Sequence, residues 1–294
     1  MSLFSSNPLL VPPLKWHGGK QYLARRLVKL LPPHVHYVEP FAGGLAVLFE
    51  KPFDGVSEVV NDLNGDLTNF WRTLQDEKLF EGFHRRVAAV PFSEKEWQDA
   101  SAAMRNPSED PVERAAAFFI ACRQSMSGRM VSFAPLSRTR TRRGMNEQSS
   151  AWWRVVDGLP EVHLRLRRVT VLNRPALDVV RTQDGKETLF YLDPPYLHET
   201  RATTYEYGDH EMTAAQHEEL LAALAKIEGR FLLSGYDNPL YERFAKENGW
   251  SVAAFELPNN SASGKTKRRM VETIWANFPL AVTPADAADT EIEE

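Results

Sequence analysis

Hydrophobic and polar residues follow two different periods along the first part of the chain. Residues 21–31 carry leucines at a helical spacing, and two prolines end this helix. Residues 34–39 and 56–60 are short and contain valines, as expected for strands. Between them, a glycine-rich turn at residues 40–44 precedes another apolar stretch, so a helix is expected to begin near Leu45. This order of strand, turn, helix and strand predicts the start of a parallel α/β sheet.

The alternation of strands and helices is lost between residues 67 and 168. Helices are expected there at residues 68–74, 93–104 and 111–122, followed by a segment rich in Arg, Ser and Gly. After this region, strand patterns resume at residues 169–172, 188–192, 231–234, 250–257 and 271–278, with helical patterns at 175–181, 213–227 and 239–248. The sequence therefore predicts an α/β domain that is split by a helical insert.

This pattern sets the expected domain boundaries. Residues 14–66 and 169–280 are expected to form the α/β domain, and residues 67–168 the insert. Residues 1–13 contain three prolines and no period, so they are interpreted as a loosely held terminus. Residues 281–294 are interpreted as a solvated tail, because their last nine positions hold five acids and no base.

Composition narrows the class of protein. The chain has 294 residues, of which 43% are apolar and 25% charged, as in average soluble domains. No uninterrupted apolar run approaches the roughly 20 residues of a membrane helix, and the N-terminus lacks the pattern of a secretory signal. The single cysteine, Cys122, cannot form an internal disulfide. We therefore expect a cytoplasmic protein with no membrane partner.

The formal net charge of -4 hides an uneven distribution. Six arginines and no acid lie between residues 123 and 143, and a second basic cluster lies at residues 265–269. Such a run is often only a solvated face. Here it is interleaved with glycines and apolar side chains, so it can also form a basic loop or hairpin that reaches a DNA groove. The sequence does not separate arginines that contact phosphates from those that read guanine edges.

The most specific chemical signal is the string Asp193-Pro194-Pro195-Tyr196, directly after the expected strand at residues 188–192. Ligands of open α/β sheets bind at the carboxyl ends of the strands. The carboxylate of Asp193 and the carbonyl of Pro194 can each accept a hydrogen bond from an exocyclic amino group, while Tyr196 stacks on a planar base. The alternative is a turn in which the aspartate caps the next segment.

This string resembles the motif of amino-group DNA methyltransferases. With residues 14–20 (LKWHGGK) and 39–44 (EPFAGG), the chain resembles the Dam-like adenine-N6 subgroup, in which the three motifs occur in this order with a target-recognition insert before the last. The resemblance extends over about residues 14–279. It implies a Rossmann-like sheet that binds S-adenosylmethionine (SAM), mostly parallel with a final antiparallel strand. In one departure, Leu45 stands where many relatives have a third glycine.

The resemblance also assigns cofactor residues. Gly43 would let the backbone approach SAM, and Asp62 would meet a ribose hydroxyl, although alone it reads equally well as a helix cap. Lys20 would bind the methionine carboxylate; without the family it would be interpreted as a solvated lysine. The full expected set is Trp16, Gly19, Lys20, Glu39, Pro40, Phe41, Ala42, Gly43, Gly44, Asp62 and Asp193. No metal is expected, because His34 and His36 have no third ligand at a suitable spacing.

The insert supplies most of the expected DNA contacts. The candidates are Arg123, Ser127, Arg129, Arg138, Arg140, Arg142, Arg143, Lys265, Lys267 and Arg268. Trp152 and Trp153 could be stacking wedges, but buried aromatics at the start of a helix are the preferred interpretation.

Together these features predict an enzyme that transfers a methyl group from SAM to N6 of adenine in a specific sequence of double-stranded DNA. Base flipping and direct transfer are the expected mechanism, with Asp193, Pro194, Pro195 and Tyr196 as catalytic residues. The alternatives are N4-cytosine methylation, an RNA or protein-amide substrate, and a catalytically silent SAM- or DNA-binding protein. A monomer is expected, and a cognate restriction enzyme is a candidate partner. Repair, phage protection and gene regulation remain alternative roles.

Overall fold

The computed structural model describes residues 10–16, 18–197, 211–257 and 270–281, and these form two compact units. One, here called the helical unit, takes its described residues from Met1–Val28, Gly43–Phe53 and Asn64–Asn173. The other, here called the sheet unit, takes them from Lys29–Ala42, Asp54–Leu63 and Arg174–Glu294. Both units are therefore assembled from segments that are far apart in the sequence.

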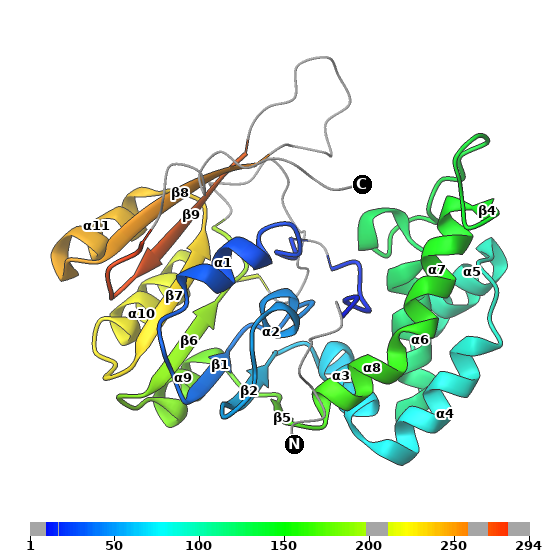
Figure 1. The fold of residues 1–294 in the computed structure, drawn as a ribbon, viewed down its shortest axis with the longest axis horizontal. Helices are drawn as coiled ribbons and strands as arrows, with labels where there is room; N and C mark the ends of the chain where they lie inside the picture. The colour runs from blue at the N-terminus through cyan, green and yellow to red at the C-terminus, as the bar shows by residue number, and fades with distance from the viewer. Residues whose placement is uncertain (1–9, 17, 198–210, 258–269, 282–294) are drawn as a thin grey trace. The chain divides into compact units, whose positions relative to one another are not determined.

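Seven strands form one mixed sheet (Figure 1). In spatial order they are β5 (Val169–Leu172), β2 (Ser57–Asn61), β1 (His36–Glu39), β6 (Thr188–Leu192), β7 (Arg230–Gly235), β9 (Met270–Ala276) and β8 (Ser251–Leu257). Strand β1 pairs in parallel with β2 and β6, and β6 pairs in parallel with β7. Strand β9 is antiparallel to both β7 and β8. The predicted fold, a mostly parallel sheet with a final antiparallel strand, is confirmed.

Strand β6 occupies the middle of this sheet. All five of its residues are buried, and its register places Phe190 opposite Val38 of β1 and Phe231 of β7. A strand covered on both faces needs no polar alternation, which explains its continuous apolar sequence. Because β6 is held between two parallel neighbours, the residues that follow it begin at a fixed position on the carboxyl edge.

Three helices belong to the described part of the sheet unit, and two of them have strong sequence signals at their ends. The three are α9 (Ala176–Gln183), α10 (Ala214–Leu224) and α11 (Pro239–Asn248), and α10 packs against the other two. A capping box between Thr213 and Gln216 starts α10. Asn238 caps α11, and Gly249 ends it in the left-handed region that glycine favours. These caps explain why α10 and α11 could be predicted, whereas α9 has no side-chain cap and is indicated by its helical spacing alone.

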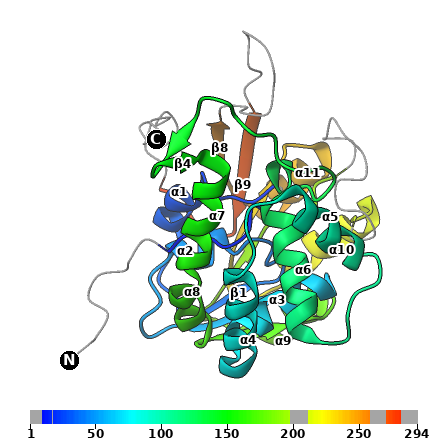
Figure 2. The same ribbon diagram turned by 90° about the vertical axis from the view of Figure 1, so that its right-hand side faces the viewer.

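The helical unit is built around α6 (Figure 2). Helix α1 (Ala24–Leu30) lies where the sequence predicts a helix. The helices that follow it are α2 (Ala46–Glu50), α3 (Gly65–Gln75), α4 (Glu77–Ala88), α5 (Glu94–Ala103), α6 (Pro111–Arg123), α7 (Glu147–Asp157) and α8 (Leu159–Leu166). Helix α6 packs against α3, α4 and α5. The rings of Phe70 and Phe119 stack with their centroids 5.8 Å apart. Trp152 is buried and its indole N–H donates to the carbonyl of Val90, so its interpretation as a core aromatic is confirmed.

The sequence pattern identifies α3, α5 and α6 but misses α4 and α8, and for α7 it indicates only a helix start near Trp152. Helix α4 carries only three buried side chains, Phe80, Phe83 and Val87, and contains Gly82, which weakens its helical signal. Among the described residues, no helix combines the length and apolar character needed to cross a bilayer.

Candidate active site

Residues 193–196 leave β6 at its carboxyl end without entering a helix. Asp193 is half-buried and Tyr196 is buried. The hydroxyl of Tyr196 lies 3.2 Å from Oδ1 of Asp193 and also donates a hydrogen bond to Oε1 of Glu272 on β9. The string therefore forms a local network with a second carboxylate, Glu272, which no sequence motif indicates.

The ring of Tyr196 is held from the neighbouring strand. Tyr236 follows directly after β7, and its ring lies edge-on to Tyr196 with centroids 4.6 Å apart. Burial, then the charges of Asp193 and Glu272, raise the pKa of the Tyr196 hydroxyl well above its usual value. The hydroxyl therefore stays neutral and remains a hydrogen-bond donor at physiological pH. Tyr236 is a second residue that the sequence pattern misses, because nothing near it forms a motif.

Strands β1 and β2 bring two more predicted residues to the same edge of the sheet. Glu39, the last residue of β1, is buried and accepts a hydrogen bond of 2.7 Å from the hydroxyl of Tyr37. Asp62 follows the last residue of β2 and is half-buried. Since β2, β1 and β6 are consecutive in the sheet and β1 is parallel to both neighbours, the strand ends that carry Glu39, Asp62 and Asp193 lie on one edge.

Asn61 ties the turn after β1 in place. Its side chain donates to the carbonyl of Pro40 at 2.9 Å and also exchanges hydrogen bonds with the backbone of Arg174. The amide of Ala42 donates to the backbone carbonyl of Asn61 at 2.8 Å. Phe41, between them, is half-buried. Asn61 is not among the residues expected from the sequence, yet its hydrogen bonds fix this turn.

In the helical unit, Trp16 explains why glycines follow that turn. A Cβ on Gly43 would lie 2.8 Å from Nε1 of Trp16, and one on Gly44 would lie 2.8 Å from its Cβ. The amide of Gly19 donates to the carbonyl of Trp16 at 3.0 Å. Glycine at residues 43 and 44 therefore makes room for Trp16, a structural cause in addition to the approach of SAM that the resemblance implies for Gly43.

Lys20 lies in the same segment and is 4% exposed. Its ammonium group donates to the carbonyl of Gly18 at 3.1 Å. The interpretation of Lys20 as a solvated lysine is therefore wrong. A buried ammonium group is costly unless polar or anionic groups surround it, which fits a role in holding an anion.

The predicted basic segment forms a hairpin. Strands β3 (Thr141–Arg142) and β4 (Met145–Asn146) pair antiparallel, and Arg143 and Gly144 between them both have positive φ, as in a two-residue type I′ turn. The exposed predicted residues here are Ser127, Arg129, Arg138, Arg140, Arg142 and Arg143. Arg140 and Arg143 lie 3.9 and 3.6 Å from Glu147 and Asp157. These solvated pairs are weak and can exchange partners.

Arg123 differs from the other arginines of the segment. It is buried, and its guanidinium donates to the carbonyl of Ala151 at 3.3 Å. Burial lowers the pKa of Arg123 to about 10. In this position it cannot reach a phosphate or a base, so its environment argues against the predicted DNA contact.

Lys15 is a further basic residue that the site prediction omits. Its ammonium group donates to Oε1 of Gln148 at 3.2 Å, and burial followed by the charge of Arg123 lowers its pKa to about 8. A Cβ on Gly128 would collide with the Lys15 carbonyl at 1.5 Å, so the start of the basic segment rests directly on Lys15. Lys265, Lys267 and Arg268 lie outside the described residues.

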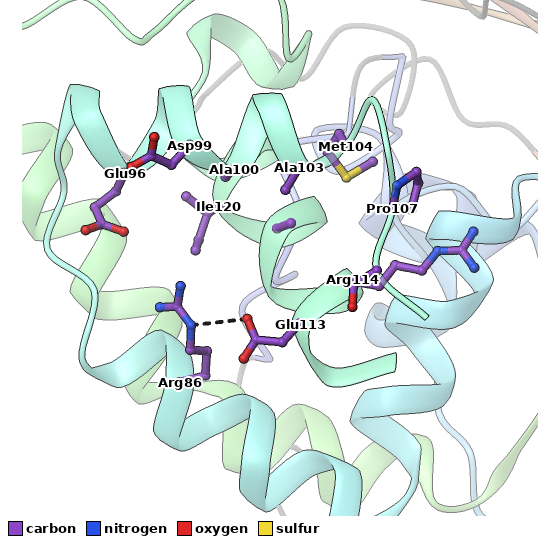
Figure 3. A pocket seen from close by; sticks show the side chains of 12 residues that line it. Arg86, Glu96, Asp99, Ala100, Ala103, Met104, Pro107, Glu113, Arg114 and Ile120 are labelled. Atoms are coloured by element: carbon purple, nitrogen blue, oxygen red, sulfur yellow. Dashed lines mark ion pairs between the residues drawn. The ribbon is translucent and has the colours of Figure 1, made fainter. Parts of the chain in front are cut away.

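A pocket of about 280 Å³ lies among α4, α5 and α6 (Figure 3). None of the predicted site residues lines it. Arg86 and Glu113 in its wall pair at 3.5 Å, and Arg114 pairs with Asp66 at 2.6 Å. Both arginines of the lining are thus paired, and we interpret the pocket as a packing gap of the helical unit.

Comparison with known proteins places the chain in a family. The sequence model of the D12 class N6 adenine-specific DNA methyltransferases matches residues 16–256. The chain belongs to this family. This methyltransferase is 26% identical to the type II methyltransferase M1.LlaDCHI of Lactococcus lactis subsp. cremoris, over 95% of this chain and 99% of the relative.

Two further relatives carry the same kind of name. A DNA adenine methylase of Vibrio cholerae is 27% identical, over 87% of this chain and 83% of its own. A DNA adenine methylase of Salmonella typhimurium is 24% identical, over 92% and 97% of the two chains. Site-specific methylation of adenine in DNA is therefore the activity of this methyltransferase, and the predicted function is confirmed in preference to N4-cytosine methylation or a silent binder.

Proposed function

We propose that the methyltransferase reaction takes place at the carboxyl edge of the sheet, with Asp193, Pro194, Pro195 and Tyr196 as catalytic residues. The observation that carries this proposal is the position of the string, directly after a fully buried strand whose carboxyl end lies beside those of β1 and β7. That edge is where open α/β sheets bind their ligands.

The amino group of adenine lies inside the base stack of duplex DNA. The enzyme therefore has to flip the nucleotide out, at a cost of a few kcal/mol. The carboxylate of Asp193 and the carbonyl of Pro194 then accept hydrogen bonds from the amino group and direct its lone pair. Tyr196 contributes the ring against which the base lies, and Tyr236 supports that ring from β7.

SAM is the proposed methyl donor, and when bound it supplies an activated methyl group on a sulfonium that leaves as a neutral thioether. In the sheet unit, carboxylates can accept hydrogen bonds from the hydroxyl and amino groups of such a molecule. Taken by itself, the buried ammonium of Lys20 in the helical unit suits a carboxylate. The proposed cofactor residues are Trp16, Gly19, Lys20, Glu39, Pro40, Phe41, Ala42, Gly43, Gly44, Asp62 and Asp193.

Double-stranded DNA is the proposed partner of the basic hairpin and the segment before it. Ser127, Arg129, Arg138, Arg140, Arg142 and Arg143 remain in the proposed set, as do Lys265, Lys267 and Arg268 on their sequence pattern. Arg123 is left out because it is buried. Five exposed arginines without a nearby excess of acids suit a phosphate backbone and guanine edges.

The biological setting belongs to the same proposal. The relative from Lactococcus lactis is named as a type II methyltransferase, which supports a cognate restriction enzyme as partner. We further propose that the protein acts as a monomer in the cytoplasm, since one adenine on one strand is modified at a time.

The test is methylation of unmethylated genomic DNA with isotopically labelled SAM, followed by mass spectrometry of the nucleosides. Wild-type protein should place label on N6 of adenine. Asp193→Ala should lower turnover by at least about 10²-fold while DNA binding is retained. Full activity of Asp193→Ala would refute the assigned site, and absence of label with the wild type would refute SAM as donor.

A further inference from the structure

Glu272 is a buried carboxylate that the motifs do not include. It is the third residue of β9 and is 2% exposed. Strand β9 runs antiparallel to β7, with Thr273 opposite Gly235 at the end of β7. The early residues of β9 therefore arrive at the carboxyl edge of the parallel strands, where Asp193 leaves β6.

The hydroxyl of Tyr196 lies between two acceptors. It donates to Oε1 of Glu272 on one side and lies 3.2 Å from Oδ1 of Asp193 on the other. A phenolic hydroxyl has one proton to donate. The carboxylates of Glu272 and Asp193 therefore compete for the hydroxyl proton of Tyr196. When this proton is donated to Glu272, it is not donated to Asp193.

This competition affects the proposed role of Asp193. A carboxylate that already accepts a strong hydrogen bond from a phenol is a weaker acceptor for a second donor, here the amino group of adenine. We propose that Glu272 is a positioning residue that draws the hydroxyl of Tyr196 away from Asp193, so that the Asp193 carboxylate is kept for the target amino group. The inference rests on the proposed site and adds a residue that acts through Tyr196.

The surroundings of the network favour this arrangement. Tyr236 packs edge-on against the Tyr196 ring, with the ring centroids 4.6 Å apart. The Tyr196 ring is thus held on one side while its hydroxyl is held by Glu272. Both constraints fix the direction in which the hydroxyl points.

The inference is tested by a double-mutant cycle on the rate constant for methyl transfer, measured in single turnovers with saturating SAM and DNA. E272L should lower this rate constant about 10- to 100-fold, because the hydroxyl of Tyr196 then turns to Asp193. In the Y196F background, where no hydroxyl is left to compete, E272L should change the rate constant by less than about threefold. The dissociation constants for SAM and DNA should not move with the rate constant.

E272Q is the control for a folding defect in E272L, because glutamine keeps the shape of the side chain and an acceptor oxygen while removing the charge. We expect it to lie between wild type and E272L in rate. Equal losses from E272L in the two backgrounds would overturn the inference, as would unchanged rates for E272L and E272Q. The wild type and Asp193→Asn in the same assay separate the proposed catalytic site from the proposed role of Glu272. An active Asp193→Asn variant refutes the catalytic site. An inactive Asp193→Asn variant together with a fully active E272L variant refutes only the role of Glu272.

Discussion

Leu45 adopts a backbone conformation that suits glycine, with φ of 56°. The left-handed region costs a residue with a Cβ about 1–2 kcal/mol. Leu45 is also buried, and removing a buried leucine side chain costs about 2–5 kcal/mol. The stabilisation from burying the Leu45 side chain therefore exceeds the cost of its backbone strain.

Both Leu45→Gly and Leu45→Ala should therefore destabilise the protein, and Leu45→Gly should be the milder of the two. Each loses the buried side chain, but only glycine relieves the strain, which should make Leu45→Gly about 1 kcal/mol more stable than Leu45→Ala. Urea unfolding of the two variants beside the wild type measures the difference. A lower free energy of unfolding for Leu45→Gly than for Leu45→Ala would contradict the strain argument.

Lys15 should make DNA binding depend on pH in the alkaline range. Its pKa is lowered to about 8, so it is charged at pH 7 and largely neutral at pH 9. If its ammonium contacts a phosphate, the slope of log affinity against log salt should fall by about 0.9 between these pH values. Fluorescence anisotropy with a DNA duplex at several salt concentrations gives both slopes.

Lys15→Met is the matched control for this prediction. Its salt slope should be equal at pH 7 and pH 9 and should match that of the wild type at pH 9. A wild-type slope that does not change with pH would mean that Lys15 makes no phosphate contact.

At the scale of elements, the tip of the β3–β4 hairpin depends on one glycine. Gly144 has φ of 76°, and a Cβ there would meet nothing within 4 Å. Gly144→Ala therefore adds backbone strain without a clash. If the hairpin binds DNA, the variant should lose affinity several-fold, a change of about 1 kcal/mol, with little change in the thermal midpoint.

Gly55 offers the comparison, since it has φ of 73° and equally open surroundings outside the basic segment. Gly55→Ala should carry the same strain and leave DNA affinity unchanged. Anisotropy and thermal melts of both variants give the result. Equal affinities for the two variants would remove the hairpin from the proposed DNA surface.

The elements that could be predicted from the sequence are those with local signals. Strand β6 is a continuous apolar run before a rare string, and α11 has proline at its start and glycine after its end. Glu272 and Tyr236 could not be predicted, because their positions depend on the pairing of β9 and β7 with strands far away in the sequence. Asn61 lies beside Asp62 and Lys15 lies within the motif at residues 14–20, but their partners, Arg174 and Gln148, are more than a hundred residues away.

At the scale of the molecule, residues 14–20 contact two regions of the helical unit with different proposed roles. The backbone of Lys15 supports Gly128, at the start of the basic segment, while the side chain of Trp16 packs on Gly43 and Gly44. Movement of the basic segment on DNA would therefore reach the proposed cofactor turn through two adjacent residues. Such a link is reciprocal, so DNA should change the affinity for SAM as much as SAM changes the affinity for DNA.

We expect saturating DNA to change the dissociation constant for SAM at least about fivefold, the lower end of typical coupling. Gly128→Ala should weaken this coupling, because a Cβ at residue 128 would displace the carbonyl of Lys15. Gly82→Ala is the control, since its added Cβ would make only an ordinary contact of 3.5 Å with Val112. Calorimetric titration of SAM with and without duplex DNA measures the coupling in each variant. If Gly128→Ala and Gly82→Ala both keep the wild-type coupling, the proposed path through Lys15 and Trp16 is wrong. Any effect of DNA on the dissociation constant for SAM must then arise elsewhere in the protein.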